Sequence, residues 1–133
     1  MANGLYAIGC KQRLLNKELD LDSDGIKAVL GDTADYTVNL ATHDDLADVA
    51  GAAIVATSGN LTSPTIAAGV FDTADFTWTT VSGDQSEFIL LYDDTHASDS
   101  LLAYYDTGIT GMPVTPNGGN INVTVNSSGW FAL

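Results

Sequence analysis

Cysteine is almost absent from this chain: Cys10 is the only one among 133 residues, so no intrachain disulfide can form. A lone cysteine within a helical pattern is most often a small buried hydrophobe. The alternative, a catalytic thiol, requires a neighbouring histidine or cation, and only Lys11 and Arg13 are close in sequence. We therefore expect Cys10 to be buried, in a protein made in a reducing cytoplasm.

Positive charge is absent from most of the chain. The four cations are Lys11, Arg13, Lys17 and Lys27, and four acids among the first 27 residues balance them. Residues 28–133 carry thirteen acids and no lysine or arginine. Phosphate backbones would repel such a body, because binding them requires cations that displace counterions. We expect no nucleic-acid partner, and we expect the basic stretch to contact something acidic.

Long apolar runs and secretory features are also missing. No stretch approaches the roughly 20 apolar residues of a membrane-spanning helix. The start, Met-Ala-Asn-Gly, lacks the basic residues and the apolar core of a secretory signal. We therefore expect no membrane segment and no secretion, and we interpret the glycosylation-like triplets at Asn60, Asn122 and Asn126 as accidental.

The composition is typical of a β protein. A chain of 133 residues predicts one domain with its own core, and thirteen glycines with abundant Thr, Ser, Asp and Asn favour strands and turns. We expect a single domain over residues 1–133, divided into an N-terminal helical arm (1–22) and a β body (23–133).

Residues 3–18 are the one candidate helix, with Asn3 placed to cap its start. An apolar stripe recurs at roughly helical spacing and is made of Leu5, Ile8, Leu15 and Leu19, with the basic residues mainly on the other side. Gly4 and Gly9 weaken this helix by about 1 kcal/mol each. A helix this short is marginal alone, so it must pack on its own β body or, as an arm, on a neighbouring protein.

A hexapeptide occurs twice, as Asp-Thr-Ala-Asp-Tyr-Thr at 32–37 and as Asp-Thr-Ala-Asp-Phe-Thr at 72–77. Each copy follows an apolar run and precedes alternating residues. Asp and Thr side chains bond to backbone N–H groups one or two residues on, which stabilises turns. Both copies are therefore predicted to be corners at which one strand ends and another extended segment begins.

About eight strands with short turns follow from the pattern. They are predicted at 26–30, 52–57, 64–71, 76–81, 88–92, 101–105, 121–125 and 130–133. The most hydrophobic run, 88–92, is the expected central strand and pairs with 101–105, and Asn-Gly at 117–118 predicts a hairpin within 113–125. This spacing is typical of an all-β fold, an antiparallel β-sandwich or barrel, jelly-roll-like, with one short N-terminal helix.

Three polar stretches are candidate metal or acid–base sites. Asp20, Asp22 and Asp24 match the opening of a calcium loop, but its twelfth position, which should be Glu, is Gly31, so we favour a solvated turn. His43 and His96 each lie beside two aspartates and are interpreted as surface-loop residues.

Catalytic signatures are missing as well: no nucleophile elbow, phosphate loop or zinc spacing occurs. We predict a non-enzymatic protein without a cofactor or metal; a glycosidase carboxylate pair, which the fold and not the spacing sets, stays open.

Several stretches share their pattern with a known family. They are the start Met-Ala-Asn-Gly-Leu-Tyr, residues 24–30 (Asp-Gly-Ile-Lys-Ala-Val-Leu), residues 32–43 (Asp-Thr-Ala-Asp-Tyr-Thr-Val-Asn-Leu-Ala-Thr-His), residues 55–59 (Val-Ala-Thr-Ser-Gly) and residues 111–121 (Gly-Met-Pro-Val-Thr-Pro-Asn-Gly-Gly-Asn-Ile). In these stretches the chain resembles the small virion structural proteins of tailed bacteriophages, over nearly its whole length. The terminal 129–133 departs from the basic end of those proteins, and no active-site motif carries over.

The resemblance implies a structural role in the virion, assembled in the host cytoplasm. It implies a capsid cement or decoration protein that binds and stabilises the outer shell or, alternatively, a head or tail fibre or appendage subunit. The partners would be the major capsid protein or other virion proteins, and symmetric capsid sites favour a homo-oligomer such as a trimer. The basic stretch and the apolar tail supply the candidate interface residues, which are Leu5, Tyr6, Lys11, Arg13, Lys17, Trp130 and Phe131.

Carbohydrate binding on a fibre is the rival function. The aromatic residues that could stack on sugar rings are Trp78, Tyr92, Tyr104, Tyr105 and Trp130. Alternation along the strand places Trp78 on the same face as Phe76, which favours a core position for this tryptophan.

Overall fold

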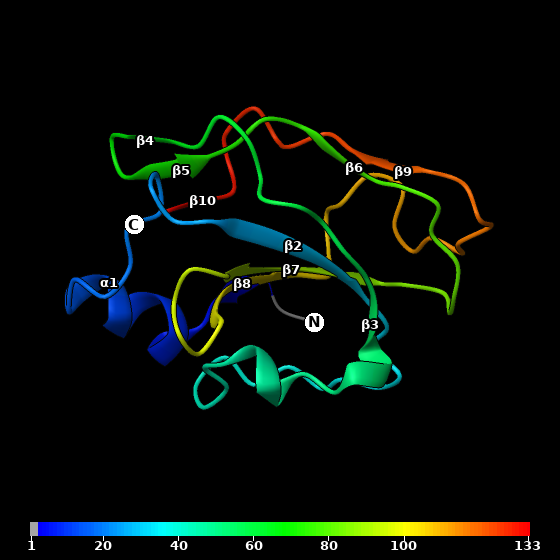
Figure 1. The fold of residues 1–133 in the computed structure, drawn as a ribbon, viewed down its shortest axis with the longest axis horizontal. Helices are drawn as coiled ribbons and strands as arrows, with labels where there is room; N and C mark the ends of the chain where they lie inside the picture. The colour runs from blue at the N-terminus through cyan, green and yellow to red at the C-terminus, as the bar shows by residue number, and fades with distance from the viewer. Residues whose placement is uncertain (1–2) are drawn as a thin grey trace.

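The computed structural model describes residues 3–133 and shows an all-β fold of antiparallel strands with one short helical segment near the N-terminus, which confirms the predicted fold class (Figure 1). The largest sheet has five strands in the order β1-β8-β7-β2-β3. These are β1 (Gly4–Leu5), β8 (Ser100–Tyr105), β7 (Phe88–Asp93), β2 (Ile26–Gly31) and β3 (Ile54–Thr57). Every residue of β7 is buried, and β7 pairs with β8, so the central strand and its hairpin are confirmed.

Two smaller sheets lie over one face of the five-stranded sheet, which gives the fold its sandwich-like form (Figure 1). One is ordered β10-β5-β4, and the other pairs β6 with β9. Their strands are β4 (Thr65–Ala67), β5 (Val70–Asp72), β6 (Phe76–Trp78), β9 (Ile121–Val123) and β10 (Phe131–Ala132).

The 3₁₀ turns η2 (Leu46–Asp48) and η3 (Gly51–Ala53) lie on the opposite face of the five-stranded sheet (Figure 1). The π-helical η1 (Ala7–Gln12) and the α-helical α1 (Arg13–Leu15) pack beside β8, and their Cys10 and Leu14 contribute to the core beneath the smaller sheets. No helix within residues 3–133 is long and apolar enough to cross a membrane.

The N-terminal helix is shorter than the predicted 3–18, and Asn3 does not cap it. Gly4 and Leu5 instead form β1 on the edge of β8. The Asn3 side-chain oxygen accepts hydrogen bonds from the backbone N–H groups of Asp106 (2.8 Å) and Thr107 (3.1 Å). Asn3 therefore ties the start of the chain to the end of β8, a long-range role that local capping rules do not reveal.

The helical segment packs on the β body. Tyr6 and Cys10 are fully buried, which confirms the prediction for Cys10. A Cβ atom at Gly9 would collide with the backbone oxygens of Leu101 and Asp44, so glycine permits the close approach of this segment to β8. Gly9, which weakens the helix, is thus required by the packing of this segment.

Both faces of the five-stranded sheet are buried. Ala28 and Leu30 of β2 join the core beneath the smaller sheets, whereas Val29 between them joins the core beneath the 3₁₀ turns. Successive side chains of a strand point to opposite faces, so a strand buried on both sides reads as a continuous apolar run. This explains why β2 and β7 were readily found from sequence.

One predicted strand and one predicted hairpin are wrong. The predicted strand 64–71 is a hairpin, because Ala68 (φ 52°) and Gly69 (φ 80°) both take left-handed conformations, as in a tight two-residue turn. The predicted hairpin within 113–125 does not form: β9 pairs with β6, and Val114 bridges to Ser86.

The first hexapeptide copy forms a turn, as predicted, whereas the second is an irregular link between β5 and β6 without a hydrogen-bonded turn. In the first copy, Asp32 accepts a bond from the Ala34 N–H, and Thr33 donates its backbone N–H and hydroxyl to Glu87. In the second copy, the Thr73 hydroxyl accepts a bond from the indole N–H of Trp130 (2.8 Å). The second copy therefore anchors the C-terminal segment.

Candidate functional site

The seven candidate interface residues fall into different environments. Lys11 and Lys17 are exposed; Tyr6 is fully buried and therefore not available to a partner. Leu5, Trp130 and Phe131 are half-buried against the core beneath the smaller sheets, and Arg13 is largely buried. The structure thus leaves two lysines of the original set on an open surface.

An exposed leucine lies beside these lysines. Leu15, predicted to lie on the apolar stripe of the helix, is 85% exposed. The π-helical turn over residues 7–12 changes the number of residues per turn, and the helix ends at Leu15, so the 3.6-residue pattern no longer predicts the buried side. We call Lys11, Leu15 and Lys17 the basic patch.

Arg13 holds the segment that carries the basic patch. Its guanidinium donates hydrogen bonds to the carboxylate of Asp45 (2.8 Å), to the hydroxyl of Ser100 (2.7 Å) and to the backbone oxygen of Asp44 (3.2 Å). The Ser100 hydroxyl in turn donates to the backbone oxygen of Gly9 (2.6 Å). Only 12% of the Arg13 side chain is exposed, so this ion pair is well shielded from solvent and rigid.

The four basic side chains differ in whether they form ion pairs. Lys27 forms an ion pair with Asp94 (3.2 Å), and Arg13 pairs with Asp44 and Asp45. Within residues 3–133, Lys11 and Lys17 form no ion pair. On a protein with a net charge of −13, the basic patch is therefore where an acidic partner meets unpaired positive charge.

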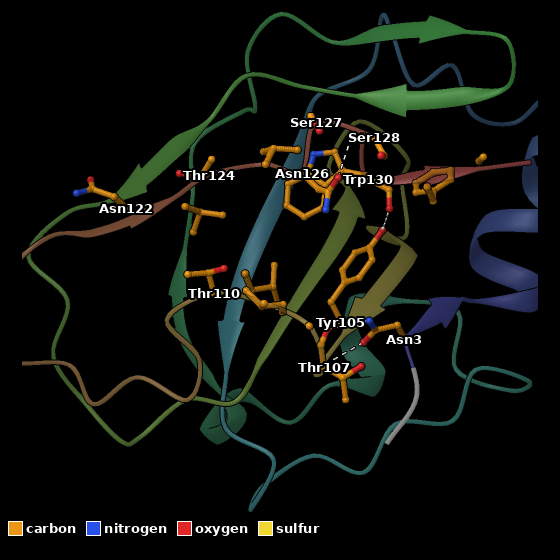
Figure 2. Close-up of a pocket in the computed structure, with 18 residues that line it drawn as sticks. Asn3, Tyr105, Thr107, Thr110, Asn122, Thr124, Asn126, Ser127, Ser128 and Trp130 are labelled. Carbon is orange, nitrogen blue, oxygen red and sulfur yellow. Dashed lines mark hydrogen bonds between the residues drawn. The ribbon is translucent and has the colours of Figure 1, made fainter.

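A groove of about 950 Å³ lies between the end of β8 and the C-terminal segment. Figure 2 shows Thr107 and Thr110 on one side, Asn126 and Ser128 on the other, and Tyr105 between them. Among the described residues 3–133, no Asp, Glu, Lys or Arg lines this groove. We call this feature the neutral groove, because it is uncharged on a strongly acidic protein.

Two aromatic rings line the neutral groove. The ring centroids of Tyr105 and Trp130 are 5.6 Å apart, and the Tyr105 hydroxyl donates to the Trp130 backbone oxygen (2.6 Å). Burial raises the pKa of Tyr105, so this hydroxyl stays protonated. The other aromatic residues proposed for sugar stacking, which are Trp78, Tyr92 and Tyr104, are buried in the core.

Both histidines hold elements together and are more than loop residues. His43 bonds through Nδ1 to the hydroxyl of Tyr36 (2.9 Å), which in turn bonds to the hydroxyl of Tyr6 (3.0 Å). His96 lies 3.3 Å from the carboxylate of Glu18. Each histidine thus joins its own loop to another segment of the chain, His43 through Tyr36 and His96 through Glu18.

Carboxylates gather in two places. Asp32, Asp35 and Asp84 have ligand oxygens within 4.8 Å of one another, the one grouping among residues 3–133 whose geometry could hold a metal ion. The stretch that holds Asp20, Asp22 and Asp24, predicted to be an acidic turn, closes on itself, since the Asp24 carboxylate accepts a bond from the Asp20 N–H (2.9 Å). Exposed acids commonly gather without a cation, so we assign no metal site to the three aspartates.

Asp93 is a fully buried carboxyl at the end of β7. One of its oxygens accepts bonds from the Thr95 and His96 N–H groups, and the other has no partner among the described residues. Burial, together with the neighbouring carboxylate of Asp24, raises the pKa of Asp93 to about 7. The Asp93 carboxyl therefore titrates near neutral pH.

The thiol of Cys10 is unreactive, because burial raises its pKa to about 12 and it remains protonated.

No protein-family model matches the chain, and a comparison with curated proteins finds no relative. Two surfaces are therefore left to indicate a function, the basic patch and the neutral groove. The first suits an acidic protein surface and the second suits an uncharged ligand.

Proposed function

We propose that this chain is a non-enzymatic structural protein of a tailed-phage virion, most specifically a capsid cement or decoration protein. In this role it binds the outer shell, made of the major capsid protein, and stabilises it. The observation that carries the proposal is the basic patch: an exposed leucine between two unpaired lysines on an otherwise acidic protein. The pattern shared with small virion proteins supports the same role.

The rigidity of the basic patch supports binding without rearrangement. Arg13 and Ser100 bond the segment to β8 and to the loop at Asp44, while Tyr6 and Cys10 are buried beneath it. A surface that is already ordered loses little conformational entropy when a partner binds. The backbone that carries the leucine and the two lysines is thus held in place before a partner binds.

The small size of the basic patch favours a repeated partner. One leucine and two lysines cover far less than the roughly 800 Å² that each partner contributes to a stable interface. Linking several weak contacts on a symmetric lattice raises the overall affinity strongly, which is why we propose a homo-oligomer, such as a trimer, on the shell. Exposed Ile66 and Leu133, outside the patch, offer apolar contact between copies.

The proposed location is the virion, assembled in the host cytoplasm. The test uses particles of the phage that encodes this chain, produced without it. Adding the purified protein should decorate the outer shell in a cryo-EM reconstruction and raise the temperature at which the shell opens. Density confined to the tail would favour an appendage subunit instead, and the absence of any bound protein would overturn a virion role.

An appendage subunit that binds carbohydrate is the second candidate function. The observation that favours it is the neutral groove, where Tyr105 and Trp130 are the two rival aromatic residues that are not buried in the core. The groove and the basic patch lie on different parts of the molecule, so one chain has room for both activities.

A further inference from the structure

We infer that the neutral groove is a binding site for a neutral oligosaccharide. This inference is independent of shell binding, because it depends on none of the residues of the basic patch. It follows from the charge, the aromatic rings, the hydrogen-bonding groups and the size of the groove.

The charge of the groove selects for an uncharged ligand. The protein has seventeen acids and four cations, yet none of them lines the groove. An acidic ligand would be repelled by the acidic protein around the groove and would find no cation inside it. A basic ligand would find no carboxylate with which to pair.

The aromatic rings supply an apolar contact whose polar atoms are already occupied. Tyr105 uses its hydroxyl on the Trp130 backbone, and Trp130 uses its indole N–H on Thr73. Neither polar atom needs a ligand, so the half-buried rings offer carbon surface to a bound molecule. One face of a pyranose ring is lined with C–H bonds and suits such a surface.

The walls of the groove supply hydrogen-bonding groups at the edge of that surface. Figure 2 shows hydroxyls of Thr107, Thr110, Ser127 and Ser128 around the groove, and all four residues are exposed. The side-chain oxygen of Asn126 accepts a bond from the Ser128 N–H, which leaves the side-chain N–H₂ group of Asn126 to donate to a ligand. Neutral donors and acceptors around an apolar floor match the hydroxyl-rich edge of a sugar.

The size of the groove indicates more than one sugar ring. Its volume of about 950 Å³ lies at the upper end of the range in which pockets bind small molecules, roughly 300–1,000 Å³. Its floor includes Ile89 and Tyr105, which lie side by side on the paired strands β7 and β8. An elongated ligand that follows this floor would contact both walls.

An extended peptide fits the groove less well than a sugar. A peptide strand needs free backbone N–H groups with which to pair. Those of Val125, Ser128, Gly129 and Trp130 already bond within the chain. These four N–H groups are therefore not free to pair with a peptide, and what remains for such pairing is the outer edges of the short strands β9 and β10.

The test is titration of the purified protein with neutral hexaoses (maltohexaose, cellohexaose and chitohexaose), followed by tryptophan fluorescence and calorimetry. Hexagalacturonate and a neutral Gly-Ser-Thr peptide serve as comparisons. We expect at least one neutral hexaose to bind and both comparisons to fail. Binding only of the acidic sugar or of the peptide, or of none of these probes, would overturn the proposal.

Two substitutions locate the site. Trp130→Ala removes a ring, and Ser127→Trp fills the groove from an exposed position; each should raise the dissociation constant at least tenfold. The patch variant Lys11→Gln/Lys17→Gln should bind nearly as the native chain does. Binding that survives Ser127→Trp would place the sugar elsewhere and contradict the inference, even if Trp130→Ala does not fold.

Discussion

The basic patch and the neutral groove depart from the acidic surface in opposite ways. The patch concentrates unpaired positive charge around one exposed leucine, and Arg13 holds it from beneath. The groove excludes charge of either sign and exposes aromatic carbon, and Trp130 holds it through Thr73. The patch lies on the helical segment that packs beside β8, and the groove lies between the end of β8 and the C-terminal segment.

The difference shows how one small domain can separate two kinds of recognition. Attraction through the patch is electrostatic and should weaken as salt rises, because exposed charges are screened beyond about 10 Å at 0.1 M salt. Contact in the groove is apolar and hydrogen-bonded, so it should depend little on salt. Substitutions in one of the two surfaces can therefore abolish its binding while the binding of the other is kept.

The largest effect is expected in the helical segment, at Gly9. Gly9→Ala places a Cβ atom against the backbone oxygens of Leu101 and Asp44, and should lower the free energy of unfolding by about 3 kcal/mol because backbone must move. Urea unfolding measures this loss. Gly51→Ala is the control, since a Cβ there meets nothing within 4 Å and should change stability by less than about 0.5 kcal/mol. Equal effects of the two changes would contradict the close packing.

Removing the Arg13 side chain should have the next largest effect. Arg13→Ala breaks the bonds to Asp44, Asp45 and Ser100, and should cost about 2 kcal/mol because the side chain is largely shielded from solvent. Arg13→Lys should recover only part of the loss, since an ammonium cannot reproduce the fork of bonds. If Arg13→Ala is as stable as the native chain in urea, the clamp does not exist.

Asp93 lies at the end of the central strand and should give stability a pH dependence. Its folded pKa of about 7 exceeds the unfolded value of about 3.9, so the folded chain holds an extra proton between these pH values. Stability from this group is therefore present at low pH and is lost as pH rises from about 4 to 7. Asp93→Asn keeps the oxygen that accepts from Thr95 and His96, and at pH 8 should be about 1–2 kcal/mol more stable than the native chain.

The Asp93 prediction is checked by thermal unfolding of both proteins between pH 4 and pH 8. The difference between them should grow with pH. A constant difference, or a native chain that gains stability relative to the variant as pH rises, would contradict the raised pKa of the buried Asp93.

On the groove side, the bond between Trp130 and Thr73 should contribute about 1 kcal/mol. Trp130→Phe and Thr73→Val each remove it, so the double variant should lose less stability than the sum of the two single losses. Urea unfolding of all four proteins gives the coupling. Additive losses would mean that the tryptophan is held by packing alone.

The smallest effect on stability is expected at the patch itself. Lys11→Gln/Lys17→Gln should change the free energy of unfolding by less than about 0.5 kcal/mol, because both side chains are exposed and form no ion pair within residues 3–133. Thermal unfolding at low and moderate salt checks this. A larger loss would mean that the lysines support the fold.

Much of the framework was predictable, because its signals are local. The buried strands β2, β7 and β8 read as apolar runs, and the first Asp-Thr hexapeptide reads as a turn. The hairpin β4–β5 was missed because Ala68, unlike glycine, rarely takes a left-handed conformation. The partner of β9 was missed because β6 lies more than forty residues away and the nearer Asn-Gly turn suggested a local hairpin.

The two surfaces were predictable only in part. The basic stretch was visible as a charge pattern, but Leu15 was assigned to the buried stripe because a π-helical turn leaves no signal in the spacing of apolar residues. The sequence named Tyr105 and Trp130 among five aromatic residues without distinguishing them from the three that are buried. Their meeting depends on the C-terminal segment bonding to Phe71 and Thr73, a contact between distant parts of the chain.

The most direct test of the account is the occupancy of phage shells by patch variants. Native protein, Lys11→Gln/Lys17→Gln, and the control Thr79→Asp/Gln85→Glu, which has the same net charge as the patch variant but alters other exposed positions, are added to shells that lack this chain. The account predicts at least a tenfold loss of occupancy for the patch variant alone, at moderate salt. Equal occupancy by all three proteins, or an equal loss in the control, would contradict it.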